Sequence, residues 1–206
     1  MRTGIGLVFT LGFAFLPISK WENEFANVVH LTVYEVIWWA AIAAVLLYVT
    51  FVERRPLSTT GVQRLSLRDA TIGFGAGIVT IAGLAFIYFV IFPALHLNEE
   101  NQMNTLLATP LWWRIVSVVR AGVGEELLYR GYAIERLEEL SGSRAVAGIV
   151  SCALFTVAHV GPWGWAHLLI AGFGGVMLTV LYLWRRNQWV NIIAHALVDG
   201  VAVLAG

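Results

Sequence analysis

Two adjacent glutamates and an arginine interrupt a long apolar stretch of the chain, in the sequence GEELLYRG that begins at Gly124. On a helix, Glu126 and Arg130 are four residues apart and share one face, so they can form an ion pair. Glu125 lies about 100° further round the helix and is not neutralised by the same arginine. It is therefore a candidate functional group, because an ionisable side chain among apolar ones needs a reason. The alternative is an ion pair and a protonated Glu125 that both serve helix packing.

Two further apolar segments carry polar side chains at helical spacing. The sequence FTVAH places Phe155 and His159 on one helix face. The sequence HALVD does the same for His195 and Asp199, a pair suited to orienting a histidine or to holding a metal. The alternatives are a packing or interfacial role for His159 and an interhelical hydrogen bond for His195 and Asp199.

The composition is that of a membrane protein. Of the 206 residues, 59% are hydrophobic and only 13% are charged, and the mean hydropathy is +0.76. A soluble domain would carry about twice that share of charge. The formal net charge of zero argues against nucleic acid as a partner, because phosphate binding needs a basic surface. Cys152 is the sole cysteine of the sequence, so an intrachain disulfide is excluded.

Long apolar runs predict an all-α fold, a polytopic bundle of about seven transmembrane helices in the lipid bilayer. The predicted spans are 4–19, 31–52, 71–94, 110–136, 144–160, 163–184 and 189–205. Residues 1–109 would form an N-terminal part with three spans, and residues 110–206 a catalytic core with four. The first span has a second interpretation as a signal peptide, although no small-x-small cleavage site precedes Lys20.

Small residues recur at four-residue spacing in the third and sixth spans. They are Gly73, Gly77, Ala171 and Gly175. Small residues so placed let helix backbones approach closely. We therefore expect the third and sixth spans to pack tightly in a compact bundle.

Positive charge is distributed unevenly between the two sides of these spans. With the N-terminus inside, the inner side collects Arg2, Arg54, Arg55, Arg64, Arg68, Arg136, Arg144, Arg185 and Arg186. The outer side collects Lys20 alone. This bias predicts a cytoplasmic N-terminus. Glu35 and His167 then lie near the outer ends of their spans, where we expect interfacial positions.

The candidate polar groups can meet at one depth. At 1.5 Å per residue, Glu125 and His159 lie about 22 Å from the inner side. By the same measure His195 and Asp199 lie roughly 13 and 20 Å deep. Four unrelated packing residues at one level are less plausible than one site, and this favours a functional interpretation.

The ordered set Glu-Glu-x-x-x-Arg, Phe-x-x-x-His and His-x-x-x-Asn/Asp resembles the CAAX protease and bacteriocin-processing family of intramembrane endopeptidases. The eukaryotic representative of that family is the type II CAAX prenyl endopeptidase. The resemblance covers residues 110–205. The residues that carry it are Glu125, Glu126, Arg130, Phe155, His159, His195 and Asp199.

The resemblance implies hydrolysis of a peptide bond within the membrane. Such a reaction needs an activated water and a group that stabilises the oxyanion. By the resemblance, Glu125 would be the general base and His159 would help to hold the water. His195 and Asp199 would bind the oxyanion. Glu126 and Arg130 would keep the helix geometry, with Phe155 also in a structural role.

Asp199 departs from the prenyl endopeptidase, which has asparagine at the matching position. An ionised aspartate only accepts hydrogen bonds, so Asp199 must be protonated, orient His195 or bind a metal. Members of the family have been described both as metalloproteases and as metal-independent glutamate proteases. His159, His195, Asp199 and Glu125 are the candidate ligands of a divalent metal such as zinc. The sequence has no His-Glu-x-x-His motif, and metal dependence stays open.

These observations predict an intramembrane endopeptidase that acts on a membrane-associated peptide or protein substrate. One alternative is a small transporter or proton-relay protein in which the same groups line an ion path. Another is a non-catalytic immunity or partner protein with the same fold. A prenylated CAAX substrate follows only from the resemblance.

Overall fold

The computed structural model describes residues 2–13, 15, 28–98 and 100–204. Within these ranges every regular element is helical, as the composition predicts. The predicted first span extends past Phe13 into positions that lie largely outside the described residues, as does Lys20.

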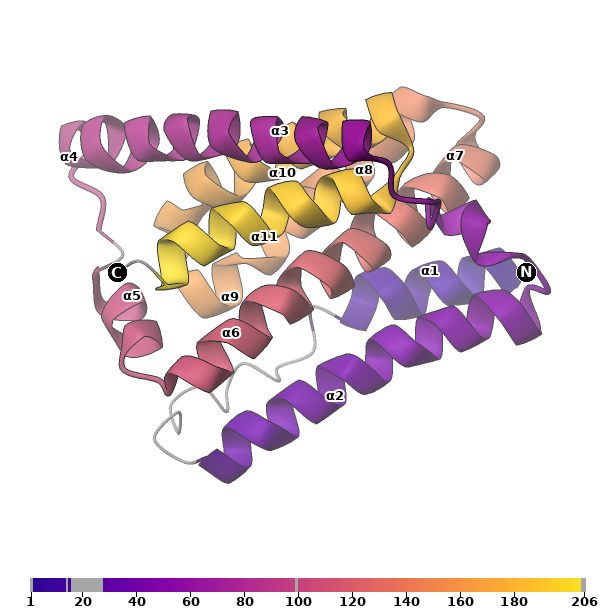
Figure 1. Cartoon of the computed structure of the whole chain (residues 1–206), viewed down its shortest axis with the longest axis horizontal. Coiled ribbons are helices and arrows are strands. Elements are labelled where there is room, and N and C mark those ends of the chain that lie inside the picture. Colours follow the sequence, from indigo (N-terminus) through magenta and orange to yellow (C-terminus); the bar gives the residue numbers. More distant parts are fainter. Residues whose placement is uncertain (1, 14, 16–27, 99, 205–206) are drawn as a thin grey trace.

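Long helical runs cross the molecule in alternating directions (Figure 1). In chain order they are α1 (Arg2–Phe13), α2 (Val28–Leu47) with η2 (Tyr48–Val52), α3 (Leu67–Phe86) with η4 (Ile87–Ile91) and α4 (Phe92–Ala94), α6 (Leu111–Arg120) with η5 (Ala121–Ile134) and α7 (Glu135–Ser141), α8 (Arg144–Ala158), α10 (Leu168–Arg185) and α11 (Gln188–Leu204). Short helices connect them: η3 (Leu57–Thr60), α5 (Glu100–Leu107), α9 (Val160–Trp163) and η6 (Trp165–His167). The chain therefore begins at one end of the bundle and reaches residue 204 at the other.

Among the described residues, four helical segments are long and apolar enough to cross a bilayer. They are Val28–Val52, Leu67–Ala94, Arg144–Trp163 and Trp165–Arg185. Of the other predicted spans, α1 and α11 are shorter, and the run from Leu111 to Ser141 carries the charged motif. The structure thus supports an integral membrane protein without establishing a count of seven spans.

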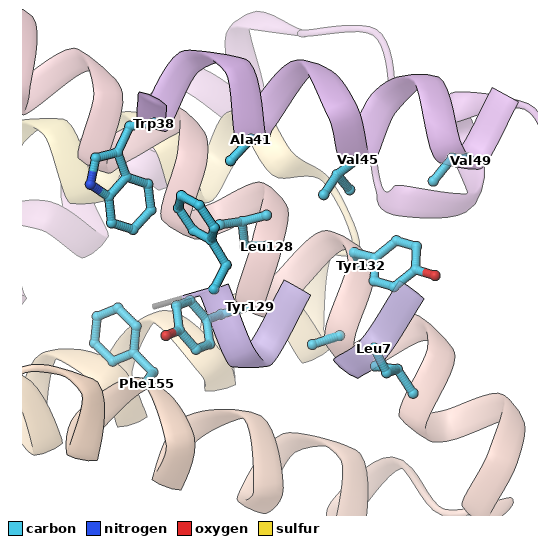
Figure 2. Close-up of a cluster of buried hydrophobic side chains, with 11 residues drawn as sticks. Leu7, Trp38, Ala41, Val45, Val49, Leu128, Tyr129, Tyr132 and Phe155 are labelled. Atoms are coloured by element: carbon cyan, nitrogen blue, oxygen red, sulfur yellow. The ribbon is translucent and has the colours of Figure 1, made fainter. Parts of the chain in front are cut away.

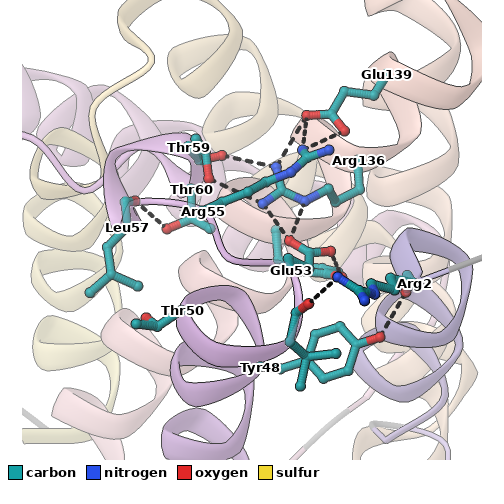
Figure 3. A network of polar contacts seen from close by, with 12 residues as sticks. Arg2, Tyr48, Thr50, Glu53, Arg55, Leu57, Thr59, Thr60, Arg136 and Glu139 are labelled. Carbon is teal, nitrogen blue, oxygen red and sulfur yellow. Dashed lines mark hydrogen bonds and ion pairs between the residues drawn. The ribbon is translucent and has the colours of Figure 1, made fainter.

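One end of the bundle is joined by a network of charged side chains (Figure 3). Arg136 is fully buried and donates to Glu53 at 2.7 Å, which ties α7 to the end of η2. Arg55 donates to Glu139 at 2.5 Å, and Arg2 donates to the carbonyl of Val52 at 3.1 Å. Arginines assigned to the inner side from the charge pattern therefore do come together at one end.

Glu138 belongs to the same end of the bundle. Arg186 and Arg144 both donate to this carboxylate. Burial alone would raise the pKa of Glu138, but these hydrogen bonds outweigh it and hold the pKa below its usual range. Glu138 is therefore an ionised link between α7, the start of α8 and the end of α10.

The apolar core lies where α1 and α2 cover η5 (Figure 2). Its buried side chains are Leu7, Phe13, Trp38, Ala41, Val45, Val49, Leu128, Tyr129, Tyr132, Ala133 and Phe155. Because helices from the N-terminal part and from residues 110–206 both contribute, the two parts share one core.

Small residues bring α3 against α11, an approach that the spacing of Gly73 and Gly77 anticipates. A Cβ on Gly73 would lie 2.6 Å from the carbonyl oxygen of Val190. A Cβ on Gly77 would lie 3.2 Å from the carbonyl oxygen of Ala194. On α10, a Cβ on Gly175 would lie 3.1 Å from the ring of Phe155 in α8. These three glycines hold the helices that carry the candidate site at short range.

Gly73→Ala should lower the thermal unfolding midpoint of the purified protein in detergent. Its methyl group meets backbone, which cannot rotate away, so overpacking should cost about 1–3 kcal/mol. Gly75→Ala is the matched control, because nothing lies within 4 Å of its Cβ position. Alanine also favours a helix over glycine, so the control should be neutral or slightly stabilised. Equal midpoints for the two variants would contradict this account of the α3–α11 contact.

Candidate active site

The GEELLYRG motif lies in η5, a π-helical segment of 14 residues inside an otherwise α-helical run. Such segments are rare and are found at functional sites. Neighbouring helices approach its glycines closely. A Cβ on Gly122 would lie 3.4 Å from Ala196 of α11, and one on Gly124 would lie 2.6 Å from Ile42 of α2. The sequence predicts a helix here, but it gives no signal for the π geometry.

Glu126 is fully buried and is the centre of a hydrogen-bond network. One carboxylate oxygen accepts from Arg130 at 2.9 Å and from the Nδ1 of His195 at 2.8 Å. The other oxygen accepts from Asn191 at 2.9 Å. The predicted ion pair with Arg130 is confirmed, and the same carboxylate also ties η5 to α11.

Arg130 extends this network to two more helices. Its side chain is fully buried and donates to the carbonyl of Gly175 in α10 at 3.3 Å. The guanidinium carbon lies 4.1 Å from the ring centroid of Phe155 in α8, a cation–π contact. Phe155 therefore supports the charged centre directly, in line with its predicted structural role.

Two residues of this network escaped the sequence analysis. Asn191 donates to the carbonyl of Leu178 at 2.7 Å as well as to Glu126. Gln188 donates to the backbone carbonyls of Glu126 at 3.0 Å and of Thr60 at 3.1 Å. A signal was present, because positions 188, 191, 195 and 199 form a polar stripe at helical spacing on α11.

His195 lies between two carboxylates. Its Nδ1 must carry a proton, because the carboxylate of Glu126 can only accept. On the other side, its Nε2 lies 3.4 Å from an oxygen of Asp199. The side chain of His195 is 7% exposed and that of Asp199 is 31% exposed. The predicted shared face is confirmed, and the Nε2 edge points toward the accessible side of the pair.

Glu125 faces His159 rather than the Glu126 network. The Nδ1 of His159 lies 2.7 Å from the carbonyl oxygen of Phe155 and donates to it, which leaves Nε2 as an acceptor in the neutral ring. That Nε2 lies 3.8 Å from a carboxylate oxygen of Glu125. The separation is too long for a direct hydrogen bond and suits a bridging water. Both side chains are partly accessible, at 15% for Glu125 and 21% for His159.

His167, which was expected near the outer end of its span, stacks on His159. The two imidazole rings have centroids 5.8 Å apart, and Trp163 also stacks on His167, with centroids 4.8 Å apart. The turn that follows α8 folds these rings together, a contact that residue spacing alone does not reveal.

Glu35 was also expected near the outer interface, and in the structure it is buried within the protein. It is 5% exposed and accepts a hydrogen bond from Arg120 at 3.1 Å. The guanidinium of Arg120 also lies 5.1 Å from the ring centroid of Trp38. Glu35 therefore joins α2 to α6 through a buried ion pair between residues distant in the sequence.

Both candidate pairs lie near Phe155, whose ring centroid is 4.5 Å from that of His159 and 6.4 Å from that of His195. The Glu125–His159 pair can polarise a water, and the His195–Asp199 pair can donate to an oxygen anion. Among the described residues, which include all four candidate ligands, no group of three or more His, Cys, Asp and Glu side chains is arranged to hold a metal ion. A metalloendopeptidase is therefore not supported by the geometry.

Comparison with known protein families confirms the resemblance drawn from the motifs. The model of the family described as Type II CAAX prenyl endopeptidase Rce1-like matches residues 107–201. The matched region contains both candidate pairs and the whole Glu126 network apart from the contact of Gln188 with Thr60. Comparison with curated proteins found no match, and comparison with solved structures found none either.

Arg130→Ala should lower the yield of folded protein and its thermal midpoint. It leaves Glu126 as a buried charge without its cation, a change that costs about 3–5 kcal/mol. Arg55→Ala is the matched control, because the side chains of Arg55 and Glu139 are 36% and 42% exposed. Loss of such a surface pair should cost no more than about 1 kcal/mol. An Arg130→Ala protein as heat-stable as the Arg55→Ala protein would show that the Glu126 network does not stabilise the bundle.

Proposed function

We propose that this chain, whose residues 107–201 match the Type II CAAX prenyl endopeptidase Rce1-like family, is an intramembrane endopeptidase. It hydrolyses a peptide bond of a membrane-associated peptide or protein. The observation that carries the proposal is the pairing of Glu125 with an unprotonated Nε2 of His159 across 3.8 Å. Both groups can accept a proton from the same water, and both remain accessible beside a fully buried polar network.

Glu125 acts as the general base in this proposal. A water between Glu125 and His159 gives one proton to the carboxylate while its oxygen attacks the peptide carbonyl carbon. The carbonyl oxygen becomes an oxyanion and needs a donor. Protonated Glu125 then delivers the proton to the departing amine, which completes hydrolysis without a net change in the enzyme.

The oxyanion donor is the His195–Asp199 pair. Glu126 fixes the ring of His195 through Nδ1, so Nε2 is the edge that can face the substrate. Asp199 contributes either by holding a proton on that Nε2 or by donating its own proton. Glu126, Arg130 and Phe155 do not touch the substrate and serve to position His195.

We further propose that residues 1–109 supply three spans and residues 110–206 a catalytic core with four. The arginine-rich end of the bundle would then face the cytoplasm, together with the N-terminus. This orientation is supported by the grouping of Arg2, Arg55 and Arg136 at one end. A prenylated CAAX peptide is the first substrate class to test, because it is the one that the family description names.

Glu125→Gln should abolish cleavage, with a loss of at least about 100-fold in kcat, because an amide cannot accept the proton of the water. The assay uses purified protein in liposomes with quenched fluorescent peptides, with and without a C-terminal farnesylated CAAX sequence. Glu139→Gln, on an exposed side chain, is the matched control and should cleave like the parent. Both variants should keep the thermal midpoint of the parent.

Cleavage by Glu125→Gln at the parental rate would remove Glu125 as the base. A parent that cleaves no peptide but carries protons or solutes across the liposome membrane would favour a transporter instead.

Asp199→Asn tests the other pair. If Asp199 donates to the oxyanion, the amide should keep most of the activity and extend it to higher pH, because an amide donates and does not ionise. If Asp199 holds a proton on His195 as its anionic partner, the same variant should lose at least about tenfold in kcat. A parent that loses activity to a strong chelator and regains it with zinc would contradict both roles. The measurement is one pH–rate profile of parent and variant, with and without chelator.

A further inference from the structure

Tyr129 is a buried phenol whose hydroxyl has no hydrogen-bond partner among the described residues. The residue is 1% exposed. Other buried tyrosines of the bundle are satisfied: Tyr132 donates to Glu53 at 2.7 Å and Tyr182 donates to Glu135 at 2.8 Å. A buried hydroxyl without a partner is unfavourable, and it calls for a bound water or ligand as its partner.

The position of Tyr129 on the helix places it beside the candidate base. It follows Glu125 by four residues, and the neighbouring pair with the same spacing, Glu126 and Arg130, is in direct contact at 2.9 Å. Tyr129 therefore shares a face of η5 with Glu125.

The ring of Tyr129 is directed toward the helix that carries the candidate histidine. It meets the ring of Phe155 edge to face, with centroids 5.2 Å apart, and Phe155 in turn contacts His159. Figure 2 shows the hydroxyl of Tyr129 directed toward Phe155. The unpartnered donor thus points toward the ring of Phe155, which is itself in contact with His159.

The hydrogen-bond capacity of a water between Glu125 and His159 is incomplete without a donor. The carboxylate and the Nε2 of His159 are both acceptors, so together they take both protons of the water. Its two lone pairs remain. One must face the substrate carbonyl carbon, and the other needs a donor if the water is to keep one orientation.

We propose that the hydroxyl of Tyr129 donates to the water held by Glu125 and His159 and so directs its free lone pair at the peptide carbonyl. This inference rests on the proposed function and adds a third ligand for the same water. Tyr129 is then a catalytic residue, since it touches the attacking oxygen. Among the described residues, the hydroxyl makes no hydrogen bond that the fold would lose without it.

Tyr129→Phe should lower kcat about tenfold and leave KM nearly unchanged, because it removes one hydrogen bond to the reacting water and no contact with the substrate. Its thermal midpoint should equal or exceed that of the parent. Tyr132→Phe is the matched control: it removes a hydroxyl that is bonded to Glu53, so its midpoint should fall while its kcat stays at the parental value. The substrate is a fluorogenic peptide that the parent protein cleaves in liposomes.

A Tyr129→Phe protein with parental kcat, or with a change confined to KM, would overturn the inference. If that variant does not fold, Tyr129→Met provides a second protein without the hydroxyl, and it should show the same loss in kcat. A failure of the proposed function can be told apart from a failure of this inference, because it would appear as undiminished cleavage by the Glu125→Gln protein. A cleaving parent, an inactive Glu125→Gln and a fully active Tyr129→Phe would refute the role of Tyr129 alone.

Discussion

The buried carboxylate of Glu126 is the constraint on which the arrangement of the site depends. A charge taken out of solvent is tolerated only when its partners are all in place. Arg130, Asn191 and His195 supply them and so fix α11 against η5. Arg130 then reaches the backbone of α10 and the ring of Phe155 in α8. Four helices are thereby connected by the Glu126–Arg130 ion pair, and the orientation of His195 is a direct result.

The two adjacent glutamates have different environments because neighbouring residues of a helix point in directions about 100° apart. Glu126 turns into the bundle, where every oxygen has a donor. Glu125 turns toward His159, with 15% of its side chain accessible and no ion pair to an arginine of the described residues. A fully bonded carboxylate is a poor proton acceptor, whereas one that lies 3.8 Å from a neutral imidazole, where a water can bridge the two from one side, remains available. The same helical segment therefore provides both the anchor and the proposed base.

Local pairs were predictable from the sequence, and contacts between distant helices were not. Glu126 with Arg130 and His195 with Asp199 follow from four-residue spacing, and the structure has both. The close approach of α3 to α11 at its glycines follows from small-residue spacing.

By contrast, Glu35 pairs with Arg120, which is 85 residues away in the sequence, and no local pattern encodes this contact. The contact between His159 and His167 depends on the turn after α8. The π-helical form of η5 has no sequence signal. Among the described residues, four segments meet the length and apolarity needed for a span, so the predicted count of seven is not confirmed.

The aspartate at position 199 can be understood from the proton count of its pair with His195. With the Nδ1 of His195 bonded to Glu126, we propose that one proton is shared between the Nε2 of His195 and Asp199, on either the imidazole or the carboxyl. In both forms the pair is neutral overall and has one hydrogen to donate.

At 3.4 Å the two groups are not tightly bonded, so an oxyanion placed beside them can compete for that hydrogen. Aspartate can thus serve where the prenyl endopeptidase has asparagine, provided that the ring of His195 keeps the Nδ1 bond that Glu126 imposes.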